Sequence, residues 1–307
     1  MRKLELQATP ESHDISIDNP LLVVEYQNTS QLPSNFRRSD DPYANCDGPL
    51  PTRSGLERLR ASAARQFSGL DLATTLERLS GSVCVVDLRQ EPHGFIDGDP
   101  VSWYGLRNWT YADKSSEAIA ELERKLVSQL NAAAEARVHL ITHKTGGCID
   151  QSLAQTITVE RAETERELLG RLGVEYVRFF VTDHHHPNPR CVDEFIRLVR
   201  GREEDSWLHF HCRSGRGRAS TFMVLNDIIL NARTVSLDDI IRRHELLGSK
   251  NLLQVSESKD KLWRYHLGTE RRAFLKTFYA YMKNQGGDDG PSWREWVETG
   301  ETSSTLT

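Results

Sequence analysis

The stretch Ser206–Ala232 reads SWLHFHCRSGRGRASTFMVLNDIILNA, and it decides the fold and the chemistry expected of the whole chain. Its first part, SWLHFHC, is short and largely apolar, which is typical of a buried strand, whereas RASTFMVLNDIILNA has the apolar periodicity of a helix. Cys212 therefore ends a predicted strand, and Arg218 begins a predicted helix. This strand–turn–helix unit, with the spacing Cys-x5-Arg, indicates an α/β protein with its chemistry in the turn.

The turn has the residues that an anion site needs. Gly215 and Gly217 let the backbone curl so that successive N–H groups point inward and form a concave nest, and the helix N-terminus behind it adds partial positive charge. Arg218 can bind two oxygens of a phosphate in a bidentate contact. The same positive field favours the thiolate form of Cys212, so the pattern predicts a nucleophile that faces a bound phosphate.

Two other interpretations of this turn stay open. Cys212 could be an inert core thiol in a loop that happens to be rich in arginine, although placing Arg213, Arg216 and Arg218 beside such a thiol is costly. The loop could also bind phosphate without cleaving it. Both alternatives predict a protein without turnover.

The composition of the chain is that of a globular protein with a local basic segment. The 307 residues carry 44 acidic and 39 basic side chains, for a formal net charge of −5, which disfavours general binding to nucleic acid or to an acidic membrane. The five cysteines form no CxxC pair, so neither a zinc knuckle nor a thioredoxin-like redox motif is expected. We expect no cofactor and no catalytic metal.

From Ser82 to Ala232, strands are predicted to alternate with helices, as in an α/β layered domain. We expect a polar lead-in over residues 1–30, a single domain over residues 31–284 and a polar tail over residues 285–307. A helix is predicted over about residues 54–80, with a break near Gly69. No secretory signal or membrane span is apparent, so we expect a soluble protein that is cytoplasmic or is translocated as an effector.

Cleavage of a phosphate ester also needs a proton for the leaving oxygen, and Asp183 is the candidate donor. It lies in VTDHHHPNP, directly after a predicted strand, at a point from which it can reach the mouth of the nest. The alternative is that Asp183 caps the helix that follows. The three adjacent histidines suggest a metal site, but adjacent side chains in an extended loop diverge, so we expect none.

These blocks carry a family resemblance. HCRSGRGRAS looks like the phosphate loop of the protein-tyrosine-phosphatase superfamily, and VVDLRQEPHGF, TDHHHP and WLHFHCRSGRGR together resemble the bacterial cysteine phytases, the tyrosine-phosphatase-like inositol polyphosphatases. The resemblance runs from about Leu32 to about Trp293. Plant-pathogen effector phosphatases share the same blocks, so the resemblance does not fix one substrate.

The resemblance implies a protein-tyrosine-phosphatase-like central sheet flanked by helices, with the Cys-x5-Arg phosphate loop between strand and helix. Cys212 is then the nucleophile, Arg218 the phosphate clamp and Asp183 the general acid, which later serves as the base. The implied substrate-binding residues are Arg37, Asp113, His184, Arg213, Ser214, Gly215, Arg216, Gly217 and Arg264. Lys259, Lys261 and Arg271 are further candidates, for which a solvated helix face is an equal alternative.

The favoured substrate is inositol hexakisphosphate, because several cationic groups surround one loop. The alternatives are a protein-tyrosine phosphatase with a phosphoprotein substrate, for which Trp109, Tyr111 or Trp263 would wall the slot, and a phosphate-binding pseudophosphatase. The pseudophosphatase is motivated by Ala219, which stands where the family has Ser or Thr. A second departure is His186, where tryptophan is common in the family.

Overall fold

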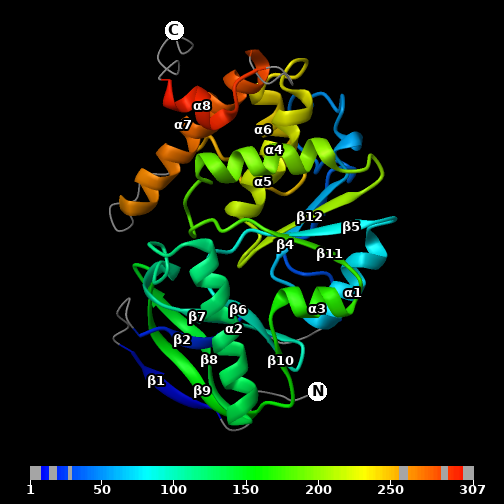
Figure 1. Cartoon of the computed structure of the whole chain (residues 1–307). Coiled ribbons are helices and arrows are strands. Elements are labelled where there is room, and N and C mark those ends of the chain that lie inside the picture. Colours follow the sequence, from blue (N-terminus) through cyan, green and yellow to red (C-terminus); the bar gives the residue numbers. More distant parts are fainter. Residues whose placement is uncertain (1–7, 14–18, 27–29, 256–261, 285–289, 300–307) are drawn as a thin grey trace. The chain divides into compact units, whose positions relative to one another are not determined.

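The computed structural model describes residues 8–13, 19–26, 30–255, 262–284 and 290–299 (Figure 1). The chain forms two compact units, each made of three segments that alternate along the sequence. The first unit comprises Met1–Pro33, Gln66–Ser80 and Arg89–Asp183, and the second comprises Ser34–Arg65, Gly81–Leu88 and His184–Thr307. No helix among the described residues is both long and apolar enough to cross a membrane.

The first unit is built on a seven-stranded sheet with the order β1-β9-β8-β2-β7-β6-β10. Its strands are β1 (Thr9–Ser12), β2 (Leu21–Val24), β6 (His93–Ile96), β7 (Asp99–Tyr104), β8 (Glu135–Thr145), β9 (Cys148–Thr158) and β10 (Ala162–Glu163). The long strands β8 and β9 form an antiparallel hairpin, and β2 pairs parallel to β8 and antiparallel to β7. The sheet is therefore mixed.

Helix α2 (Ser116–Ala133) lies along one face of this sheet, as Figure 1 shows. Its side chain Val127 packs with Trp103, Val138 and other buried residues of the strands. The N-terminus of α2 is capped by the Ser115 hydroxyl, which accepts a hydrogen bond from the backbone amide of Ala118. The other elements of this unit are α1 (Gly69–Arg78), η2 (Leu106–Asn108), α3 (Glu165–Arg171) and β11 (Glu175–Arg178).

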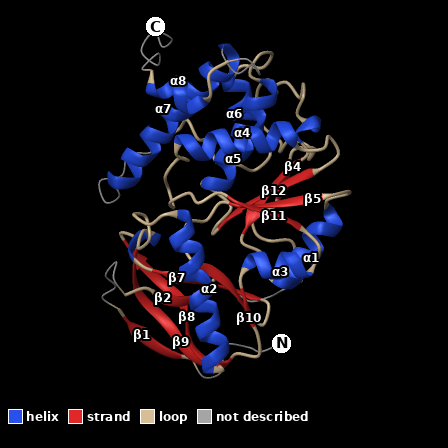
Figure 2. Ribbon diagram, viewed as in Figure 1, coloured by secondary structure: helices blue, strands red, loops and turns tan. Residues whose placement is uncertain are grey.

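The second unit contains strands in the order β5-β12-β4-β3 and a group of helices (Figure 2). Its elements are β3 (Arg37–Arg38), η1 (Glu57–Leu59), β4 (Ala61–Arg65), β5 (Val83–Asp87), α4 (Pro189–Gly201), β12 (Trp207–Cys212), α5 (Arg218–Asn231), α6 (Leu237–Leu246), α7 (Leu262–Asn284) and α8 (Trp293–Glu298). The central strand β12 runs parallel to both β4 and β5. Edge-to-face contacts of Phe195 with Phe210 and Phe222 join α4, β12 and α5 in the core. The fold is thus α/β, with mixed sheets and eight α-helices among the described residues.

The helix predicted over residues 54–80 is wrong in its middle part. Ala61–Arg65 is the strand β4, and only Gly69–Arg78 forms a helix of the expected kind. Alanine has the highest intrinsic helix propensity, but here Ala61, Ala63 and Ala64 are fully buried in a strand beside β12. Tertiary pairing overrides the local preference.

The two ends of the chain also differ from the predicted lead-in and tail. Within residues 1–30, β1 and β2 are strands of the first unit's sheet, and Val23 of β2 is fully buried. Within residues 285–307, α8 buries Trp293 and Trp296, and the backbone amide of Trp293 donates to the Asp193 carboxylate at 2.8 Å. The predicted lead-in and tail therefore contribute residues to the folded units.

Candidate active site

The candidate nucleophile lies at the carboxyl end of the central strand of the second unit. β12 ends at Cys212, and α5 begins at Arg218. Cys212 pairs in register with Arg65 of β4, and His211 pairs with Asp87 of β5, so strands flank the thiol on both sides. Cys212 is 2% exposed and Arg218 1% exposed, so both residues are buried in the fold.

Gly215 fixes how closely this turn approaches strand β4. Its φ is +72°, and a Cβ atom built there would lie 2.6 Å from the carbonyl oxygen of Ala64 and closer still to the Ala64 carbonyl carbon and the Arg65 nitrogen. Any side chain would therefore collide with backbone, and only glycine fits. The backbone of the turn at Gly215 therefore packs directly against the backbone of β4 at Ala64 and Arg65.

The side chain of Arg37 forms hydrogen bonds to the turn and to neighbouring segments. The side chain is 3% exposed. It donates from Nη2 to the carbonyl oxygen of Gly215 at 3.1 Å and to the Ser220 hydroxyl at 2.9 Å. Its Nε donates to the Ser249 hydroxyl at 2.8 Å, and Nη1 donates to the Asn35 carbonyl at 2.8 Å. These four hydrogen bonds give Arg37 a positioning role for the turn; that it also contacts a substrate phosphate stays a prediction.

Further hydrogen bonds hold the rim of the turn. Asn35 donates from Nδ2 to the carbonyl oxygen of Ser214 at 2.9 Å, and Arg216 donates from Nε to the Asn35 side-chain oxygen at 3.4 Å. Arg218 donates from Nη1 to the carbonyl oxygen of Leu88 at 3.2 Å, at the end of β5. The turn is thus tied by hydrogen bonds to the segments that follow β5 and precede β3.

The charges around the turn act on one another. Burial lowers the pKa of Arg37 to about 10, and the negative charge of a Cys212 thiolate acts in the opposite direction. Partial burial, followed by the positive charges of Arg271 and Arg264, lowers the pKa of Lys250. A Cβ atom on Gly217 would lie 4.0 Å from Nη1 of Arg271, so this cationic group borders the turn. The second unit therefore gathers excess positive charge around its Cys-x5-Arg segment.

His184, Trp263 and Arg264 form one stack of side chains in the second unit. The imidazole of His184 meets the Trp263 ring edge to face, with centroids 5.0 Å apart, and Cζ of Arg264 lies 5.0 Å from the centroid of that ring. His184 itself has a φ of +70°. Two of the predicted substrate-binding residues are thereby brought together on one aromatic side chain. Lys259 and Lys261 lie outside the described residues.

His186, which the family resemblance marks as a departure from tryptophan, contacts an aromatic side chain of α7. Its ring stacks on Phe274 of α7, with centroids 4.8 Å apart and planes 9° apart. Its Nδ1 lies 2.9 Å from the carbonyl oxygen of Pro187. The imidazole thus keeps an aromatic anchor for the segment after Asp183, despite the substitution.

Asp183 and Asp113 belong to the first unit. The indole Nε1 of Trp109 donates to the carbonyl oxygen of Asp183 at 2.9 Å, and the hydroxyl of the preceding Thr182 donates to the side-chain oxygen of Gln90. The backbone at Asp183 is therefore held by two side chains of its own unit. Asp113 is exposed.

Asn35, Ser249 and Lys250 were not predicted from the sequence. Asn35 lies two residues before Arg37, and its amide is the group that contacts the rim of the turn. Ser249 and Lys250 follow helix α6, and only the folded second unit brings them to the Arg37 side chain and the cationic cluster. A search for polar residues beside each predicted site residue could have found Asn35, but no local signal points to the other two.

Comparison with known proteins defines the class. A family model for PTP-like phytases, described as inositol hexakisphosphate, matches residues 86–230. A PTP-like phytase from Bdellovibrio bacteriovorus is 33% identical, with 95% of this chain and 98% of that chain covered and a TM-score of 0.72. The protein is therefore of the protein-tyrosine-phosphatase superfamily. Within it, the chain belongs to the PTP-like phytase family.

The chain is also similar to two longer proteins. The PTP-like myo-inositol phosphatase from Mitsuokella multacida, solved with myo-inositol-(1,3,4,5)-tetrakisphosphate, is 30% identical with a TM-score of 0.85, and the match covers 92% of this chain and 48% of that one. The effector protein hopD2 of Pseudomonas syringae pv. tomato is 27% identical over 249 residues, or 79% of this chain and 52% of hopD2. The chain spans about half the length of each of these two proteins.

Proposed function

We propose that the protein is a cysteine-dependent phosphatase that removes phosphate from inositol polyphosphates through a phospho-cysteine intermediate. The observation that carries this proposal is the position of Cys212 at the end of β12 and of Arg218 at the start of α5, with Gly215 pressed against β4 between them. Membership of the PTP-like phytase family supports the same chemistry. The segment from Cys212 to Arg218 is, in this proposal, the phosphate loop.

In the first step, Sγ of Cys212 attacks phosphorus, and the bond from phosphorus to the ester oxygen breaks. Amide groups of the loop and the guanidinium of Arg218 bind the equatorial oxygens, whose charge they stabilise in the transition state. Asp183 gives its proton to the departing alcohol oxygen. The step ends with a thiophosphate on Cys212 and an Asp183 carboxylate.

In the second step, the Asp183 carboxylate takes a proton from water, and the water oxygen attacks the thiophosphate. The sulfur leaves as a thiolate, inorganic phosphate is released, and both side chains return to their starting forms. Ala219 removes the hydroxyl that relatives place directly after the arginine, while the next hydroxyl, on Ser220, accepts a hydrogen bond from Arg37 at 2.9 Å. We therefore expect breakdown of the intermediate to be the slow step.

The substrate class follows from the number of cationic groups. Arg264 and Arg271 each interact electrostatically with Lys250, and Arg271 borders the loop. One phosphate ester occupies the loop with Arg218, so additional cations suit a substrate with several phosphates, such as inositol hexakisphosphate. The inositol tetrakisphosphate complex of the Mitsuokella relative supports this choice.

Two experiments test the proposal. Cys212→Ser should abolish phosphate release from inositol hexakisphosphate and still bind the substrate; full activity in this variant would refute the mechanism. Phosphate release from inositol hexakisphosphate is then compared with release from a phosphotyrosine peptide at equal concentrations. A clear preference for the peptide would refute the substrate class and leave the mechanism standing.

Two alternative functions have specific support. The family resemblance leaves open a tyrosine phosphatase that acts on phosphoproteins after translocation into a host cell, and the similarity to hopD2, a protein named as an effector, agrees with that alternative. Ala219 favours a phosphate-binding pseudophosphatase, because the hydroxyl that eases thiolate release is missing at that position. Turnover of para-nitrophenyl phosphate excludes the pseudophosphatase, and the comparison of substrates above separates the two enzymes.

A further inference from the structure

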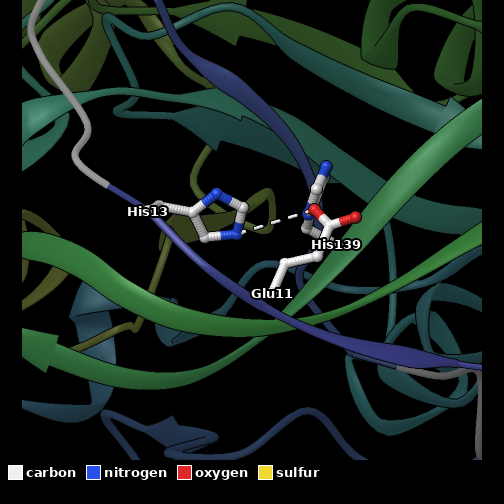
Figure 3. A group of neighbouring side chains, drawn as sticks. All are labelled: Glu11, His13 and His139. Carbon is white, nitrogen blue, oxygen red and sulfur yellow. Dashed lines mark ion pairs between the residues drawn. The ribbon is translucent and has the colours of Figure 1, made fainter.

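A second group of chemically active side chains lies in the first unit, on the seven-stranded sheet. Glu11 belongs to β1, His13 follows directly after that strand, and His139 belongs to β8 (Figure 3). Each offers one potential metal-binding atom, and these three atoms lie within 4.8 Å of one another. The side chains are 29%, 12% and 7% exposed, respectively, so the group is sheltered and still open to solvent on the side of Glu11. All three residues lie outside the Cys212 segment and its proposed chemistry.

The two imidazoles point at the same place. Nε2 of His13 lies 2.7 Å from the hydroxyl oxygen of Ser152, and Nδ1 of His139 lies 3.0 Å from the same oxygen. Hydrogen bonds of an imidazole run in the ring plane along the direction in which it also binds a metal. The two nitrogens are therefore already convergent. Ser152 comes from β9, the strand between β1 and β8, so three neighbouring strands supply the group.

The carboxylate completes a set of three ligand atoms. Oε2 of Glu11 lies 4.0 Å from Nε2 of His13 and 3.7 Å from Nδ1 of His139. Bonds of about 2.0–2.2 Å at a tetrahedral angle put two ligand atoms roughly 3.4 Å apart. The two distances from the carboxylate oxygen therefore exceed the value for a metal site by about 0.3 and 0.6 Å, a difference that small side-chain shifts can close.

The orientation of the Glu11 carboxylate also suits a cation. Arg137 binds Oε1 of Glu11 and leaves Oε2 turned toward the imidazoles. Its positive charge weakens the attraction for a cation, while its hydrogen bond fixes the orientation of the carboxylate.

We propose that Glu11, His13 and His139 bind one zinc-like divalent transition metal ion, with a water molecule or the Ser152 hydroxyl as the fourth ligand. Two imidazoles and one carboxylate are a ligand set that suits Zn²⁺, and they suit Ca²⁺ or Mg²⁺ poorly. The bound ion links β1 and His13, the residue directly after it, to His139 of β8. The site is structural in this proposal and does not take part in phosphate release.

The test is isothermal titration calorimetry, in which Zn²⁺ is added to the untagged, metal-free chain in a phosphate-free buffer. A Cys212→Ser background removes the reactive thiol. Glu11→Gln and His13→Gln remove one ligand each at partly exposed positions. His143→Gln is the matched control, because His143 lies on β8 like His139 but its Nδ1 lies 2.8 Å from the Asp150 carboxylate. Circular dichroism checks that all variants are folded.

We expect one Zn²⁺ per chain in the background protein and in the His143→Gln control, and affinity at least about tenfold weaker in Glu11→Gln and in His13→Gln. Zn²⁺ should also raise the Tm of the background protein and not that of the two ligand variants. No saturable binding, or equal affinity in all four proteins, would overturn the proposal. A thiolate-to-metal charge-transfer band on titration with Co²⁺ would also overturn it, because cysteines would then hold the ion.

Discussion

The close approach of Gly215 to β4 makes one substitution especially informative. In Gly215→Ala, the new methyl group would lie 2.4 Å from the carbonyl carbon of Ala64 and from the backbone nitrogen of Arg65, whereas ordinary van der Waals contact begins at 3.4 Å. The turn and β4 must then separate by about 1.0 Å, because the atoms in the way belong to backbone and cannot rotate aside. The left-handed φ of +72° adds a conformational cost for any residue with a Cβ atom.

The magnitude follows from these two contributions. The left-handed conformation costs about 1 kcal/mol, and overpacking costs about 1–3 kcal/mol, so a destabilisation of about 3 kcal/mol is expected. For a chain of this size that lowers Tm by roughly 6–12 °C. A loop displaced by nearly 1 Å should also lower the rate of phosphate release by roughly 10²-fold.

The assay is thermal unfolding followed by circular dichroism, together with phosphate release from inositol hexakisphosphate. Gly217→Ala is the matched control from the same turn, because its φ is −91° and the nearest atom to a Cβ atom there is Nη1 of Arg271, at 4.0 Å. Its Tm should stay within a few degrees of wild type. If Gly215→Ala unfolds at the wild-type temperature and keeps the wild-type rate, the close approach does not shape the turn, and the reasoning fails.

Three further predictions concern Arg37, Trp109 and Asp227. Arg37→Lys keeps the charge but cannot make the four hydrogen bonds of the guanidinium, so kcat should fall with little change in KM; a rise in KM alone would instead show that Arg37 contacts substrate. Trp109→Phe removes the hydrogen bond to the carbonyl of Asp183 and should lower kcat by about tenfold or less, with no further loss in an Asp183→Asn background; additive losses would contradict a role through Asp183. Burial tends to raise the pKa of Asp227, but hydrogen bonds from His244 and Arg243 outweigh it and hold that pKa below its usual value, so the ion pairs stabilise the fold above about pH 4 and lose this contribution as the pH falls further. Asp227→Asn should therefore cost about 3–5 kcal/mol at neutral pH in denaturant unfolding and show a weaker loss of stability in acid than wild type; a stability equal to wild type at pH 7 would count against these buried pairs.

The parts of the fold that the sequence predicts well are those whose pattern is local. β12 and α5 lie within a residue of the expected bounds, because an apolar strand, two glycines and an apolar helix follow each other without interruption. The Ser115 cap of α2 and Pro189 at the start of α4 are signals of the same local kind, since both act within one turn of helix. Such segments carry their structure in their own residues.

The parts that the sequence does not predict depend on remote partners. Ala61–Arg65 is a strand only because β12 and the Gly215 turn pack against it, and the short strands β1 and β2 exist through pairing with β9, β7 and β8. The supports of the candidate site have the same origin. Arg37 meets Gly215 and Ser249 across 178 and 212 residues of sequence, a relation that no spacing in a single sequence reveals.

The family resemblance supplied roles that geometry then qualified. Arg37 is expected from the resemblance to contact substrate, which stays a prediction, and the structure adds hydrogen bonds from its side chain to Gly215 and Ser220. His186 is a departure from the tryptophan that is common in the family, and its ring stacks on Phe274. In both cases the sequence identifies the residue, but only the structure shows which side chains and backbone groups it contacts.

The most direct measurement is the identification of the covalent intermediate. The enzyme is mixed with inositol hexakisphosphate, quenched in acid during turnover and digested, and the peptide that contains Cys212 is weighed by mass spectrometry. The account predicts one phosphoryl group on the sulfur of Cys212 in the wild-type protein and none in Cys212→Ser. Turnover that continues in Cys212→Ser, or a phosphoryl group found on a different side chain, would contradict it.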